Sequence, residues 1–116
     1  MPLEGRDAAY LWDMLQAAKE VDEMMQDHDL AGFLGNLVLQ RAVERSLEII
    51  GESARRVSPE GQEALVEIPW REIIGQRNIL AHEYGQIDHE LLFKTVEEDI
   101  PKLIRDLEKA LPPIED

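Results

Sequence analysis

Residues 37–57 read LVLQRAVERSLEIIGESARRV, and their apolar side chains recur at steps of three and four. This spacing places the apolar residues on one side of an α-helix, so the sequence predicts a helix over about residues 33–57. The resulting stripe consists of Leu39, Val43, Leu47, Ile50, Ala54 and Val57. An amphipathic helix of this length buries such a stripe against neighbouring helices.

The same spacing continues on both sides of this segment. It predicts a helix over about residues 6–27, a short helix that begins at Ser58-Pro59, a helix from Ile68-Pro69 to about Gly85, and a last helix capped by Asp88. Pro101 lies inside the last helix and is expected to kink it. The sequence therefore predicts one all-α domain over residues 1–116, an antiparallel four-helix bundle with one additional short helix.

Two glycines occupy similar places in the predicted helices. Gly51 and Gly75 each follow a Glu-Ile-Ile triplet, at residues 48–50 and 72–74. Glycine inside a helix costs about 1 kcal/mol relative to alanine. We expect a close approach of two helices to offset this cost at both positions.

The composition limits the class of protein. The chain has 116 residues, and the absence of cysteine excludes disulfides, thiolate metal sites and cysteine nucleophiles. The first residues carry no basic run followed by an apolar one, so no signal peptide is expected. No apolar stretch approaches the length of a membrane span. A cytoplasmic protein fits these features best.

Acidic residues outnumber basic ones, 25 against 12, for a net charge of −13. This balance argues against broad nonspecific binding of nucleic acid, which depends on lysine and arginine. Residues 31–85 are the most balanced part, and all of their basic residues are arginines: Arg41, Arg45, Arg55, Arg56, Arg71 and Arg77. If the chain contacts a phosphate at all, the contact is expected in this middle part.

Residues 75–85, GQRNILAHEYG, contain polar side chains where a buried helix face would be apolar. At about 100° per residue, Arg77 lies in the middle of the apolar side, and Asn78 and His82 lie together on its flank. A cation there needs a partner or a polar cleft. Arg77 either pairs with Glu48 or Glu52 of the preceding long helix, or faces a groove between two subunits.

These residue types suit the cleavage of RNA without a metal ion. Arginine is a permanent cation that binds phosphate, asparagine forms hydrogen bonds, and histidine transfers protons near neutral pH. One group moves protons at the 2′-hydroxyl and the leaving 5′-oxygen, and another stabilises charge on the phosphoryl oxygens. His28, His82 and His89 are too scattered to predict a metal site.

Arg77, His82 and Tyr84 are spaced as in the Arg-x4-His-x-Tyr motif, and the chain resembles HEPN-domain proteins, more narrowly the HepT toxins of HepT–MntA toxin–antitoxin pairs. The resemblance covers nearly the whole chain. It includes the segments 6–13, 40–55, 68–75 and 99–103 in the family's order.

The resemblance implies a homodimer whose two motifs meet in one cleft, and a metal-independent endoribonuclease that leaves a 2′,3′-cyclic phosphate and a 5′-hydroxyl. Arg77 and His82 are then catalytic, Asn78 supports them, and Glu52 orients Arg77. The implied partner is an MntA-like minimal nucleotidyltransferase, which uses ATP and Mg²⁺ to attach AMP to Tyr84 and so silences the toxin. The chain itself then needs no cofactor.

Two alternatives stay open. One is a noncatalytic HEPN dimer that binds nucleotides, RNA or a nucleotidyltransferase. The other is a purely structural bundle in which Arg77 and His82 are buried and paired. If the protein does cut RNA, its positive potential must come from a local group of arginines, and Arg41, Arg45, Arg55 and Arg56 provide it only where they border the cleft.

Overall fold

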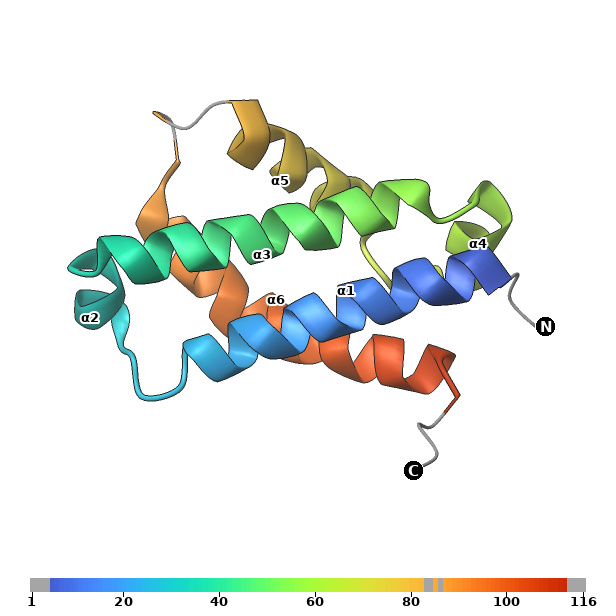
Figure 1. The fold of residues 1–116 in the computed structure, drawn as a ribbon, viewed down its shortest axis with the longest axis horizontal. Helices are drawn as coiled ribbons and strands as arrows, with labels where there is room; N and C mark the ends of the chain where they lie inside the picture. The colour runs from blue at the N-terminus through green and yellow to red at the C-terminus, as the bar shows by residue number, and fades with distance from the viewer. Residues whose placement is uncertain (1–4, 83–84, 86, 113–116) are drawn as a thin grey trace.

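The computed structural model describes residues 5–82, 85 and 87–112. Within these residues the secondary structure is entirely helical, which confirms the all-α prediction (Figure 1). The helices are α1 (Gly5–Met24), α2 (Leu30–Leu34), α3 (Leu37–Arg56), α4 (Pro59–Ala64), α5 (Trp70–His82) and α6 (His89–Ala110). None of the helices described is both long and apolar enough to cross a membrane.

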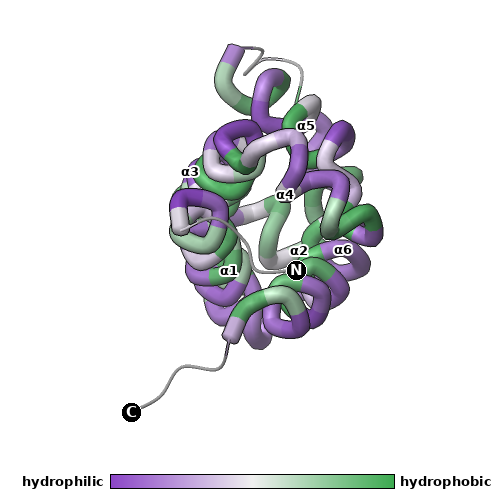
Figure 2. Tube along the Cα trace, turned by 90° about the vertical axis from the view of Figure 1, so that its right-hand side faces the viewer, coloured by the Kyte–Doolittle hydropathy of each residue, from purple (hydrophilic) through white to green (hydrophobic). Residues whose placement is uncertain are grey.

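The long helices run antiparallel to their neighbours, with α3 between α1 and α5 (Figure 1). Helix α6 packs against α1 on the other side of the bundle. Hydrophobic residues of α1, α3 and α6 face one another across the middle of the molecule (Figure 2). The most fully buried side chains include Leu11, Met14, Val21, Phe33, Val43 and Leu107. The predicted stripe of α3 is buried from Leu39 to Ala54.

The helix predicted over residues 33–57 is two helices in the structure. Asn36 caps α3, because its side-chain oxygen accepts a hydrogen bond from the Leu39 N–H at 3.0 Å. The Gln40 side chain donates to the carbonyls of Phe33 and Leu34, each at 3.0 Å, and holds α2 against α3. The bundle therefore contains two short helices, α2 and α4, where the sequence predicted one.

The helix ends follow from capping residues. The Ser58 hydroxyl accepts from the Gly61 N–H at 3.0 Å and caps α4, which begins at Pro59 as the sequence predicted. The Asp88 carboxylate accepts from the N–H groups of Glu90 and Leu91, so the predicted cap of the last helix is confirmed. Asp7 of α1 is buried and accepts hydrogen bonds from the Ser58 N–H and hydroxyl at 2.9 and 2.6 Å, which joins α1 to α4. Helix α1 ends at Met24, earlier than predicted. Helix α6 continues through Pro101.

The two glycines differ in their surroundings. A Cβ atom on Gly51 would overlap the Arg77 side chain and lie 3.1 Å from the Ile73 carbonyl oxygen, so α3 and α5 approach closely there, as predicted. A Cβ atom on Gly75 would meet no described atom within 4 Å. The prediction of a close helix approach is therefore wrong for Gly75 within a single chain, because that side of α5 faces outward.

Candidate active site on helix α5

Arg77 reaches from α5 to a carboxylate of α3. Its Nη2 atom lies 2.9 Å from Glu52 Oε2, and its side chain is 23% exposed. Glu48, the other candidate partner, instead lies 3.7 Å from Arg45 on its own helix. Arg77 thus has the ion-pair partner that its place on an apolar face required, while part of the guanidinium stays open to solvent.

Glu52 holds two further arginines. Its Oε1 atom accepts hydrogen bonds from Arg55 Nη2 at 2.9 Å and Arg56 Nη2 at 3.1 Å. Its Oε2 atom is buried and accepts no aligned hydrogen bond, so the contact with Arg77 is an ion pair rather than a directed bond. One carboxylate faces three guanidinium groups, which leaves a local excess of positive charge in an acidic protein.

This arrangement lowers the pKa of Glu52 from its ordinary value of 4.5. The hydrogen bond from Arg55 contributes most, the charges of Arg55 and Arg77 and the hydrogen bond from Arg56 add to it, and burial opposes them. Glu52 is therefore ionised at neutral pH and keeps the Arg77 guanidinium in place. Arg55 and Arg56 both pair with Glu52. Arg41 and Arg45 instead pair with Glu44 and Glu48, which lie nearer the start of α3.

Asn78 gives Arg77 a second acceptor. The Arg77 Nη1 atom donates to the Asn78 side-chain oxygen at 3.1 Å. The guanidinium is thus fixed between an amide from its own helix and a carboxylate from α3. The structure brings together three of the predicted site residues, Arg77, Asn78 and Glu52.

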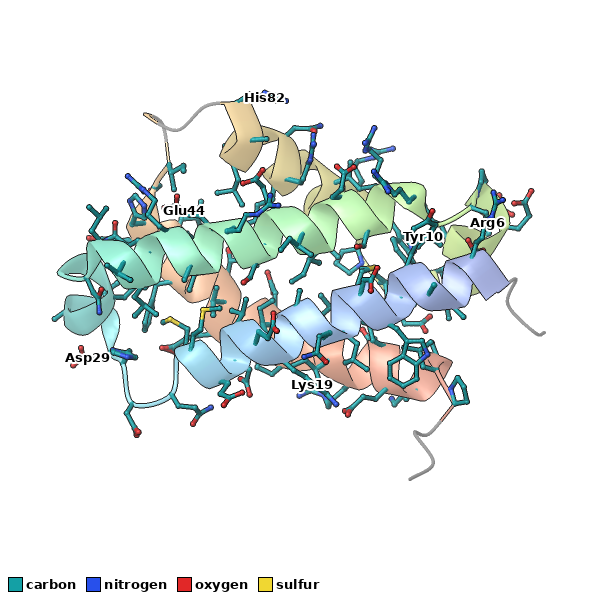
Figure 3. All side chains as sticks on the ribbon, viewed as in Figure 1. Arg6, Tyr10, Lys19, Asp29, Glu44 and His82 are labelled. Atoms are coloured by element: carbon teal, nitrogen blue, oxygen red, sulfur yellow. The ribbon has the colours of Figure 1, made fainter. Side chains whose placement is uncertain are left out.

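His82 lies apart from this group. It is the last residue of α5 and is exposed, at the end of the helix that stands away from the bundle (Figure 3). Five residues of helix turn the chain by about 500°, so His82 projects about 140° around the axis from Arg77 and about 7.5 Å further along it. One chain therefore presents Arg77 and His82 on different sides of α5. Tyr84 lies outside the described residues.

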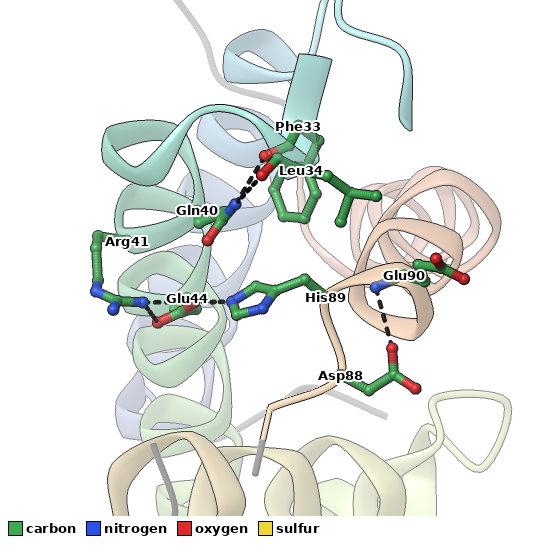
Figure 4. Close-up of polar contacts among 8 residues, drawn as sticks. All are labelled: Phe33, Leu34, Gln40, Arg41, Glu44, Asp88, His89 and Glu90. Atoms are coloured by element: carbon green, nitrogen blue, oxygen red, sulfur yellow. Dashed lines mark hydrogen bonds and ion pairs between the residues drawn. The ribbon is translucent and has the colours of Figure 1, made fainter. Parts of the chain in front are cut away.

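A second ionic cluster, which the sequence did not reveal, lies at the start of α6. The Glu44 carboxylate is only 8% exposed, and it forms a 2.7 Å hydrogen bond with His89 Nε2 (Figure 4). Arg41 Nη1 donates to both oxygens of Glu44 at 3.1 Å. The spacing of Arg41 and Glu44 is typical of a helical pair, but no local pattern links residue 44 to residue 89. This cluster anchors the start of α6 to α3, directly after the connection that follows His82.

A cavity of about 420 Å³ opens on another side of α5, between α3, α5 and α6. Its lining combines the apolar side chains of Leu47, Ile50, Ile73, Ile100 and Leu103 with the carboxylates of Glu67, Glu72, Asp99 and Asp106. Lys102, which also lines the cavity, pairs with Asp106 at 2.6 Å and leaves three carboxylates, which repel the phosphates of a nucleic acid. The cavity is therefore not the place where RNA would meet Arg77. Among the described residues no group of three or more His, Asp or Glu side chains is placed to hold a metal ion.

The fold and these residues define a class: an all-α bundle that carries a fixed arginine and an exposed histidine on one helix. Comparison with known proteins agrees with this class. The family model described as "HepT-like: Ribonuclease HepT-like" matches residues 14–110, which include Glu52, Arg77, Asn78 and His82. The chain belongs to this HepT-like ribonuclease family.

Individual relatives share most of their length with this chain. It is 43% identical to "Putative RNase MJ1380" of Methanocaldococcus jannaschii over 100 residues, which cover 86% of this chain and 92% of the relative. It is 39% identical to "Probable ribonuclease HepT" of Thermococcus cleftensis over 86% of this chain and 91% of that protein. No solved structure matches the chain.

Proposed function

We propose that this protein is a metal-independent endoribonuclease that works as a homodimer, and that it is the toxin of a HepT–MntA type toxin–antitoxin pair acting in the cytoplasm. The observation that carries the nuclease proposal is the fixed Arg77 guanidinium. It is held by Glu52 and Asn78, remains partly exposed, and shares a short helix with the exposed His82.

The proposed reaction uses the 2′-hydroxyl of the RNA as nucleophile. The 2′-oxygen forms a bond to the adjacent phosphorus, the bond from phosphorus to the 5′-oxygen breaks, and the leaving oxygen takes up a proton. The products are a 2′,3′-cyclic phosphate and a 5′-hydroxyl. His82 transfers protons: it accepts one from the 2′-hydroxyl and donates one to the leaving 5′-oxygen. Arg77 stabilises the negative charge on the phosphoryl oxygens.

A second copy of the chain supplies what one copy lacks. A single chain has one His82, and that residue projects to a different side of α5 from Arg77. Large apolar side chains remain exposed on α5, at the start of α3 and at the start of α6: Ile79, Leu37, Val38 and Leu91. These parts of the three helices lie toward the same end of the molecule (Figure 1). They support a dimer in which Arg77 of one chain works with His82 of the other.

The test is cleavage of RNA in the presence of a chelator. Arg77→Ala and His82→Ala are each expected to lower the rate by about 100-fold or more, because each removes a group that acts in the transition state. Arg105→Ala, at an exposed arginine of α6, is the matched control and should cut like the wild type. Wild-type activity in both site variants, with correctly folded proteins, would end the nuclease proposal.

The proposed regulation acts on Tyr84. A minimal nucleotidyltransferase partner, with ATP and Mg²⁺, would join the tyrosine oxygen to the α-phosphorus of ATP and release pyrophosphate, so that an anionic nucleotide stands two residues from His82. The resemblance and the position of Tyr84 in the sequence support this step. Intact mass and peptide mapping after co-expression with such a partner should show AMP on Tyr84. Suppressed toxicity with an unmodified Tyr84 would contradict it.

A noncatalytic role is the second candidate, and the net charge of −13 favours it. In that case the dimer binds a nucleotide, RNA or a nucleotidyltransferase through the same helix. It predicts that the unmodified wild-type protein leaves RNA intact in the chelator assay. Cleavage that depends on Arg77 and His82 would exclude this candidate.

A further inference from the structure

The outward side of α5 carries a row of four residues: Arg71, Gly75, Asn78 and His82. They are spaced by four, three and four positions, which places them one above another on a helix. Arg71, Asn78 and His82 are exposed, and Gly75 is half-buried. We call this row the outer α5 face. The row runs from His82, at the end of α5, back to Arg71 in the first turn of the helix.

Arg71 differs from the other arginines of the middle part of the chain. Arg41, Arg45, Arg55, Arg56 and Arg77 each pair with a glutamate of α3. Arg71 has no ion pair among the residues that the structure describes, so its charge is not neutralised by a neighbour there. A cation of this kind is what an acidic protein needs in order to attract a phosphate to one chosen place.

Gly75 lies between Arg71 and the pair Asn78 and His82. A Cβ atom at this position would meet no described atom within 4 Å, so packing within the chain does not require glycine there. Glycine inside a helix costs about 1 kcal/mol, and one of its uses is to let a ligand approach the backbone closely. The outer α5 face thus has no side chain at its middle, at Gly75, and a positive charge in its first turn, at Arg71.

The described carboxylates closest to Arg71 in the sequence lie toward another side of α5. Glu72 follows Arg71 by one residue, which is about 100° around the axis, and Glu67 and Glu72 line the cavity between α3, α5 and α6. These two acidic groups are therefore separated from Arg71 around α5. A polyanion on the outer α5 face avoids them.

We propose that the outer α5 face is the path of the RNA strand and that Arg71 binds a backbone phosphate away from the scissile one. This inference rests on the proposed ribonuclease function. Residues 71 and 82 are separated by about 16 Å along the helix, so Arg71 contacts a phosphate several nucleotides from the cleavage point. Gly75 leaves room for the strand between the two contacts.

The test measures binding and cleavage separately, with one short, fluorescein-labelled, single-stranded RNA of mixed sequence. Arg71→Ala is expected to weaken binding severalfold at low salt and to reduce the slope of log affinity against log salt by about 0.7, because one phosphate contact is lost. It should raise KM and leave kcat unchanged. Arg71→Lys should restore most of the binding, since the charge remains.

Arg105→Ala is the matched control, because Arg105 is also exposed and has no ion pair in the part of the chain described. If Arg71→Ala and Arg105→Ala show the same affinity and the same salt slope, the inference is wrong even when the wild type cuts RNA. The wild type could also bind RNA without cutting it, with binding weakened by Arg71→Ala and not by Arg105→Ala. That result would support the proposed RNA path and contradict the proposed ribonuclease activity. Absence of RNA binding by the wild type would overturn both.

Gly75→Leu provides a second, independent test. A Cβ atom at this position meets no described atom within 4 Å, and leucine favours the helix over glycine, so the melting temperature should not fall. Its side chain should obstruct the strand and weaken RNA binding severalfold, with the oligomeric state unchanged. A variant that binds RNA like the wild type, or that alters the oligomeric state by blocking a second copy, would contradict the proposed path.

Discussion

Helices α3 and α5 contain the same four residues, Glu-Ile-Ile-Gly, at positions 48–51 and 72–75, and the last two of them lie in different surroundings. In α3, Ile50 is 2% exposed and Gly51 is buried against Arg77. In α5, both isoleucines are only half-buried and Gly75 faces open space. Because α3 lies between α1 and α5, packing within the chain explains why Ile50 and Gly51 occur at these positions. Helix α5 packs mainly on α3, so its remaining sides are free of close packing among the described residues.

The largest effect should come from the core that α1, α3 and α6 share. Leu107 is fully buried, so Leu107→Ala is expected to lower the free energy of unfolding by about 2–5 kcal/mol. Ile79 of α5 is 45% exposed, and Ile79→Ala should cost less than about 1 kcal/mol. Urea denaturation monitored by circular dichroism measures both. Similar losses for the two variants would show that Ile79 of α5 is packed as tightly as the core of α1, α3 and α6.

The next effect concerns the contact between the two helices. A Cβ atom on Gly51 would overlap Arg77, so Gly51→Ala is expected to cost about 1–3 kcal/mol and to push α5 away from α3. Chemical shifts of Arg77 and Glu52 should change, because their ion pair is stretched. An unchanged stability would mean that α3 and α5 are not in close contact at this point.

Gly75→Ala is the matched change in α5 and should act in the opposite direction. Alanine favours the helix and meets no described atom, so the free energy of unfolding should rise by about 1 kcal/mol. Urea denaturation of Gly51→Ala and Gly75→Ala compares the two changes in the free energy of unfolding directly. A loss of stability in Gly75→Ala would contradict this prediction, because it would mean that another part of the protein packs against Gly75.

The smallest effect is the pH dependence that Glu52 contributes. Its pKa is lowered in the folded protein, so its stabilising contribution is complete above pH 4.5 and is lost as the pH falls below that value. Wild-type protein should therefore lose more stability between pH 6 and acidic pH than Glu52→Gln does. Urea denaturation across this range measures the difference. Parallel pH profiles would show that Glu52 is not held by its three arginines.

The sequence predicted most of the helical architecture because helix spacing and caps are local. The stripe of α3, the start of the short helix at Ser58-Pro59 and the cap Asp88 lie where they were expected. The break at Asn36 was missed, because the apolar spacing continues across it and the capping hydrogen bond depends on the turn between α2 and α3. The environment of Gly75 was also missed, since it depends on which helices cover α5.

The candidate site was predictable in part. The place of Arg77 on an apolar face indicated either a partner on α3 or a groove between two subunits, and the structure pairs Arg77 with Glu52 rather than Glu48. The gathering of Arg55 and Arg56 at the same carboxylate was left open by the sequence, although their spacing from Glu52 suits helical ion pairs. The pairing of Glu44 with His89 joins residues far apart in the chain, so only the fold reveals it.

The central claim is that α5 completes its site with a second copy of the chain. The most direct measurement is RNA cleavage by Arg77→Ala and His82→Ala chains, each alone and after co-refolding in equal amounts. Each alone should be inactive, and the mixture should recover roughly a quarter of the wild-type rate, because about half of the randomly mixed dimers carry one site with both residues intact. A mixture as inactive as its components would contradict the shared site.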